Sequence, residues 1–96
     1  MVEVRQTEAF DRWFRKLRDR RARARIQVRI DRLALGIAGD VKPVGEGLSE
    51  LRIDYGPGYR VYFIRQGEAA VVLLTGGDKT TQGRGIAAAF SLARSL

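Results

Sequence analysis

Apolar and polar residues alternate along two stretches in the middle of the chain, 48–55 and 59–65. This period of two residues is typical of strands with one buried face. A Gly-Pro-Gly loop at 56–58 separates the two stretches, so we predict a hairpin. A third stretch, 69–75, is mostly apolar, which is typical of a central strand buried on both faces. Shorter strands are predicted at 2–5 and at 41–44, where Pro43 favours a sheet edge or an extended linker.

Three other stretches have apolar residues at helical spacing. The first, 8–17, follows Thr7, which is suited to cap it, and the second runs from Asp19 to about Leu35. Together they form a predicted αα-hairpin. A last helix is predicted from about Gln82 to Ser95. The apolar faces consist of Phe10, Trp13, Phe14 and Leu17, then Ala22, Ile26, Ile30 and Leu33, and finally Ile86, Ala89, Phe90 and Ala93.

The predicted order of elements is therefore β-α-α-β-β-β-β-α, an α+β fold. Consecutive hairpins are expected to make an antiparallel sheet, with the N-terminal strand and the αα-hairpin packed on it. The chain has 96 residues, a usual size for one hydrophobic core, so we predict a single domain over 1–96.

The alternation divides the two central strands into a packing face and an outward face. The packing face takes Leu51, Ile53, Tyr59, Val61 and Phe63. Arg52 and Arg60 lie on the other face of adjacent strands, as cross-strand neighbours within reach of one phosphate. Tyr62 shares that face, and Lys79 follows the next strand. We predict that these four residues form one outward group that binds a phosphodiester, the alternative being exposed charge that only keeps the protein soluble.

The charge balance indicates a polyanionic partner. The chain has 18 Lys and Arg against 11 Asp and Glu, a net charge of +7. Arginine predominates among the basic residues, and its planar guanidinium suits phosphate groups. The densest part of this charge lies on the predicted αα-hairpin, where many like charges stand four residues apart.

Cysteine and histidine are absent, which excludes disulfides and thiolate chemistry and removes the commonest acid–base group and metal ligand. With no acidic cluster either, we predict no metal and no other cofactor. The chain begins without a signal peptide and contains no apolar run of membrane-spanning length. We therefore expect a soluble cytoplasmic protein with no membrane partner.

The stretch LSELRIDYGPGYRVYF, the following VVLL strand and the GGDKTTQ segment resemble the RelE/HigB group of toxins from type II toxin–antitoxin systems. The branch described as addiction-module killer proteins looks most similar. The resemblance covers nearly the whole chain. It implies a metal-independent endoribonuclease that cleaves mRNA on the ribosome by attack of a ribose 2′-hydroxyl, and so inhibits translation. It also implies a cognate antitoxin, a small helix-turn-helix protein from an adjacent gene, and contact with operator DNA only through the antitoxin complex.

The resemblance also implies roles for individual residues. Arg60 matches the arginine of the GYR motif as transition-state stabiliser, Arg52 matches a basic position of the preceding strand, and Lys79 is a phosphate clamp or proton donor. The tyrosine that such toxins have in the last helix is missing, so the general base stays open among Tyr62, Glu50 and Lys79. Contacts with RNA or the ribosome are expected from Arg15, Lys16, Arg18, Arg20, Arg21, Arg23, Arg25 and Gln82.

Two other functions fit the same residues. One is a ParE-like toxin of this fold that binds DNA gyrase without nuclease activity. The other is a nucleic-acid-binding or regulatory module that is not toxic.

Overall fold

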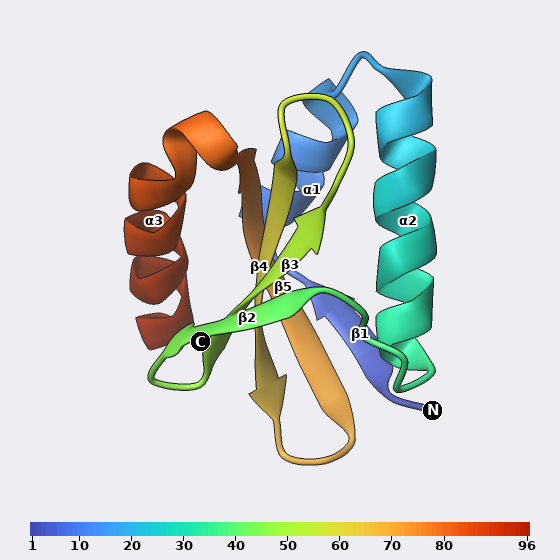
Figure 1. Ribbon diagram of the computed structural model, residues 1–96. Coiled ribbons are helices and arrows are strands. Elements are labelled where there is room, and N and C mark those ends of the chain that lie inside the picture. The colour runs from blue at the N-terminus through green and yellow to red at the C-terminus, as the bar shows by residue number, and fades with distance from the viewer.

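The computed structural model describes residues 1–96 as a five-stranded sheet with helices on both faces (Figure 1). The α+β class and the predicted order of elements are confirmed, with one 3-10 turn added before the last helix. In chain order the elements are β1 (Glu3–Gln6), α1 (Glu8–Lys16), α2 (Arg20–Ala34), β2 (Val41–Gly45), β3 (Leu48–Ile53), β4 (Tyr59–Gln66), β5 (Ala70–Asp78), the 3-10 turn η1 (Lys79–Thr81) and α3 (Gln82–Arg94). None of the helices is long and apolar enough to cross a membrane.

The strands lie in the order β1-β5-β4-β3-β2. The predicted antiparallel pairing holds from β2 to β5, because each of these strands follows its neighbour through a hairpin. β1, which was expected only to pack on this sheet, joins its edge and pairs with β5 in parallel. The αα-hairpin accounts for this, since it separates β1 from the other strands and returns the chain at the far edge of the sheet.

The larger part of the core lies between the sheet and the αα-hairpin. The predicted apolar faces of both helices pack here on the predicted packing face of β3 and β4. The buried members are Phe10, Ile26, Ile30, Leu33, Leu51, Ile53, Val61, Phe63, Val71 and Leu73. Thr7 and Asp19 cap the two helices as expected, because their side chains accept hydrogen bonds from backbone N–H groups of the first turn.

A smaller core lies on the opposite face, under α3. It consists of Leu48, Tyr62, Val72, Leu74 and Ala89, with Ile86 and Phe90 at its margin. The side chains of β5 therefore enter both cores, which confirms the predicted central strand. The second face of the sheet is not the open surface that the alternation alone suggested, because α3 covers part of it.

β5 continues further than predicted. The strand was predicted over 69–75, yet Gly76 and Gly77 also pair with Val61 and Arg60 of β4. Gly76 has a packing role, because a Cβ atom at this position would collide with the ring of Trp13. The missing side chain therefore lets α1 pack closely against the strand.

Candidate functional site

The site lies where β3 and β4 meet their connecting loop. Arg52 and Arg60 are directly opposite each other in the β3–β4 register, which confirms the predicted cross-strand pair. A pocket of about 350 Å³ opens beside them, and Lys79 lies on its wall. The rest of the lining is Asp40, Ile53, Asp54, Gly56, Pro57 and Gly58.

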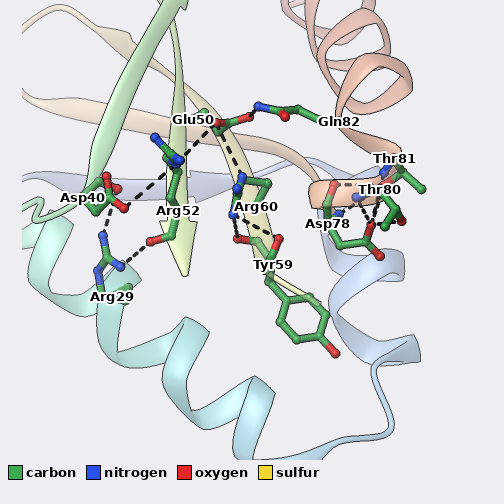
Figure 2. Close-up of polar contacts among 11 residues, drawn as sticks. Arg29, Asp40, Glu50, Arg52, Tyr59, Arg60, Asp78, Thr80, Thr81 and Gln82 are labelled. Carbon is green, nitrogen blue, oxygen red and sulfur yellow. Dashed lines mark hydrogen bonds and ion pairs between the residues drawn. The ribbon is translucent and has the colours of Figure 1, made fainter. Parts of the chain in front are cut away.

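Arg60 is more buried than expected, with only 6% of its surface exposed. Its Nη1 donates to the carbonyl oxygens of Gly58 at 3.0 Å and Tyr59 at 3.2 Å. Its Nε lies 3.6 Å from Oε1 of Glu50, and Figure 2 shows both sets of contacts. No hydrogen bond within the chain involves Nη2. The guanidinium is thus fixed on two sides and keeps one amino group for a ligand.

Arg52 is held less tightly, with 40% of its side chain exposed. Its Nε lies 4.0 Å from a carboxylate oxygen of Asp40 and 4.0 Å from Oε1 of Glu50. Its backbone carbonyl accepts a hydrogen bond from Arg29 of α2, so the helix anchors this part of the strand. The Arg52 side chain can therefore reach into the pocket while its backbone stays in place.

Lys79 is exposed at the start of η1, and Asp78 fixes the backbone around it. One oxygen of Asp78 accepts from the backbone N–H groups of Thr80 at 2.9 Å and Thr81 at 3.1 Å. The Thr80 side chain, followed by these N–H groups, lowers the pKa of the Asp78 carboxyl. Asp78 is thus ionised at neutral pH and keeps Lys79 at the pocket wall.

Tyr62 does not belong to an outward group, and this expectation is wrong. α3 covers the ring completely, and Gly85 lies against it. Burial first, and then the negative charge of Glu50, raises the pKa of Tyr62 to about 12. The hydroxyl is therefore protonated at neutral pH and enclosed, which removes Tyr62 from the candidates for general base.

Glu50, one of the candidates for the general base, is buried beside both arginines. The alternation of β3 puts Glu50 on the same face as Arg52, which was expected to point outward, but the carboxylate is fully buried. One oxygen accepts a 2.8 Å hydrogen bond from Nε2 of Gln82, and the other faces both arginines. Gln82, expected to contact RNA, thus has its amide nitrogen bound to Glu50. The strand position of Glu50 was visible in the sequence, whereas its cover by α3 was not.

The turn between α1 and α2 lies at the same end of the molecule as the β3–β4 loop (Figure 1). The Tyr55 hydroxyl, next to that loop, donates to Asp19 at 2.9 Å, and Arg25 stacks on the Tyr55 ring at 4.9 Å. Arg15 is paired with Asp11 at 2.9 Å. The other predicted contact residues of the hairpin form no ion pair: Lys16, Arg18, Arg20, Arg21 and Arg23.

Comparison with known proteins places the chain in a family. Residues 12–94 match the family model described as phage derived protein Gp49-like (DUF891). An uncharacterized protein of Haemophilus influenzae is 48% identical over 95 residues, which cover 99% of this chain and 96% of that protein. Gp49-like proteins are similar to the toxins of toxin–antitoxin systems, within the RelE and addiction-module killer superfamily. The chain belongs to the Gp49-like family of phage-derived proteins, a toxin-like family.

Proposed function

We propose that this protein is the toxin of a type II toxin–antitoxin system and that it cleaves mRNA on the ribosome, as RelE/HigB toxins do. One observation carries the proposal. The guanidinium of Arg60 is immobilised in a polar pocket with Nη2 unpaired, and Arg52 and Lys79 lie around the same pocket. Three cationic groups around one cavity suit a phosphodiester, and more so the extra charge of its transition state.

The proposed reaction needs no covalent enzyme intermediate. The 2′-oxygen of a ribose attacks the adjacent phosphorus and loses its proton, the bond from phosphorus to the 5′-oxygen breaks, and that oxygen takes up a proton. The products are a 2′,3′-cyclic phosphate and a 5′-hydroxyl. In this proposal Arg60 and Arg52 stabilise the negative charge of the phosphorane, and Lys79 protonates the leaving oxygen.

Two of the expected proton acceptors for the 2′-hydroxyl do not reach the pocket. Tyr62 is enclosed and protonated, and the carboxylate of Glu50 is buried under α3. Asp40 and Asp54 are the carboxylates that line the pocket, and they are the acceptors that it offers to the 2′-hydroxyl. In our proposal the ribosome supplies much of the rate by holding the mRNA in line for attack.

The test is cell-free translation with the 5′ ends of the mRNA mapped. We expect cuts phased with codons, and Arg60→Ala should reduce their rate by roughly 100-fold or more. Arg65→Ala is the matched control, because Arg65 is an exposed arginine further along the same strand and outside the pocket. Intact mRNA in the presence of the folded protein would refute the proposal, and inhibition of gyrase supercoiling would then identify a ParE-like toxin.

An antitoxin is the partner that we propose with this function. The net charge of +7 and the unpaired basic residues of the hairpin suit an antitoxin segment that is acidic or amphipathic. In this proposal a small helix-turn-helix protein from the adjacent gene supplies that segment and carries the complex to operator DNA.

A further inference from the structure

We propose that Glu50 is a positioning residue, which orients the guanidinium of Arg60 toward a bound phosphodiester and is itself held by Gln82. The proposal deepens the proposed ribonuclease function and rests on it for the identity of the ligand. The orientation of Arg60 by Glu50 is a property of the folded protein alone, so it can be tested separately.

The first argument is the burial of the carboxylate. A buried charge requires opposite charges or hydrogen bonds, because an ion that has lost its water is otherwise strongly destabilised. Glu50 is fully buried, yet it accepts only the hydrogen bond from Gln82. Its other oxygen, Oε1, accepts none and lies 3.6 Å from Nε of Arg60 and 4.0 Å from Nε of Arg52. The two arginines are therefore the counter-charges of Glu50.

The second argument concerns the two arginines. Like charges directly opposite each other on adjacent strands repel, and Arg52 and Arg60 are such a pair. Glu50 lies two residues before Arg52 on the same face of β3 and faces both of them. The trio keeps a net charge of +1, and Lys79 adds a positive charge at the pocket wall, where Asp40 and Asp54 add two negative ones. Glu50 thus reduces the repulsion between the two arginines, while Nη2 of Arg60 stays available to an anion.

The third argument is a count of donors on Arg60. A guanidinium has five N–H bonds: one on Nε and two on each terminal nitrogen. The Nη1 group is engaged by two backbone carbonyls, and Nε faces Glu50. The two N–H bonds of Nη2 make no hydrogen bond within the chain. Without the charge of Glu50, the plane of the guanidinium would be held from one side only.

Gln82 completes the arrangement from another element. It is the first residue of α3, directly after the η1 turn that Asp78 fixes. Its amide nitrogen holds one oxygen of Glu50 at 2.8 Å, which leaves the second oxygen for the arginines. In this proposal Gln82 acts through Glu50 and does not contact RNA.

The enzymatic test separates positioning from binding. Glu50→Gln keeps the volume of the side chain and removes its charge, and Gln82→Leu removes the donor. We expect kcat to fall roughly 10- to 100-fold, since misplacement of a catalytic group by about 1 Å has effects of this size. Affinity for ribosomes carrying an uncleavable 2′-deoxy mRNA should stay unchanged or increase, because a negative charge near the phosphate is lost. Glu68→Gln removes an exposed charge in the β4–β5 turn and is the matched control.

The second readout needs neither RNA nor ribosome. The Nε–H proton of Arg60 should give a resolved NMR signal with slow solvent exchange, and Glu50→Gln should speed up that exchange severalfold or broaden the signal away. If Glu50→Gln does not fold, the same NMR measurement on Gln82→Leu, which leaves the charge of Glu50 in place, tests the proposal. An unchanged Arg60 signal would overturn the proposal, as would a loss of mRNA affinity with kcat preserved. Failure of the wild type to cleave mRNA, with the NMR effect present, would refute the ribonuclease function and leave the orientation of Arg60 by Glu50 standing.

Discussion

The hydroxyl of Tyr62 is a polar atom enclosed between β4 and α3. It has no hydrogen-bond partner, and Leu48, Val72, Leu74 and Ala89 belong to the same buried cluster. The hydroxyl lies near the buried carboxylate of Glu50, and this negative charge raises the pKa of Tyr62. Tyr62 therefore differs from Tyr55 and Tyr59, which lie on the opposite face and are only partly buried.

Tyr62 should titrate near pH 12, above the ordinary tyrosine pKa of 10.0. The folded state keeps the neutral phenol while the unfolded chain ionises at its ordinary pKa of 10.0. The resulting contribution to stability is complete below pH 10 and is lost as the pH rises toward 12. Ultraviolet absorbance of tyrosinate follows the ionisation, and denaturant unfolding at each pH follows the stability. In Tyr62→Phe the ionisation step near pH 12 should disappear. If this step persists in the variant, it does not belong to Tyr62.

At the scale of elements, the first turn of α3 determines how closely this helix packs on the sheet. Gly85 lies where a Cβ atom would come within 2.8 Å of the Tyr62 ring, whereas a Cβ atom at Gly83 would meet nothing within 4 Å. The helix can approach the sheet this closely only because residue 85 has no side chain. The same approach closes the space over Glu50 and Tyr62.

These two glycines make a matched pair of substitutions. Gly83→Ala should stabilise the protein by up to about 1 kcal/mol, because alanine is the better helix former. Gly85→Ala offers the same gain but must displace the buried ring, so we expect a net loss of about 1 to 3 kcal/mol. Denaturant unfolding measures both. Equal effects of the two substitutions would show that α3 does not pack against Tyr62 as described.

The elements themselves were predictable from the sequence because their signals are local. Periodicity located the three helices and the strands β1, β3 and β4, and an apolar run located β5. Thr7 and Asp19 identified the starts of the first two helices. The docking of α3 was not predictable, since its apolar stripe does not indicate which part of the sheet it covers. Arg60 and Tyr62 lie two residues apart on β4 and so share a face of the strand, yet Arg60 lines a pocket whereas Tyr62 lies under α3. The pairing of Arg52 with Arg60 could be predicted, because it depends only on the loop that connects their two strands. The burial of Glu50 could not, because it depends on where α3 docks.

At the scale of the molecule, positive charge gathers at the end that carries the β3–β4 loop. Arg18, Arg20 and Arg21 form no ion pair there, and they lie around the turn of the αα-hairpin. A surface of this kind releases counterions when it binds a nucleic acid, which makes the affinity depend on salt.

Replacing these three arginines with glutamine should weaken binding to ribosomes and lower its salt dependence. Each lost phosphate contact reduces the slope of log K against log salt by about 0.7 to 0.9, so we expect a decrease of about 2 to 3. The control is a triple variant with the same loss of charge, Lys42→Gln, Arg65→Gln and Arg94→Gln, taken from exposed positions on other elements. If both triple variants changed the slope equally, net charge alone would explain the binding.

Trp13, packed over Gly76, has one more consequence. It is the only tryptophan of the chain, and its ring lies edge-on to Tyr59 at a centroid distance of 6.4 Å. Tyr59 stands next to Arg60 on β4, and Gly76 belongs to the adjacent strand. The protein therefore carries an intrinsic optical reporter at the junction of α1, β4 and β5. Its emission can follow folding and ligand binding without any attached dye.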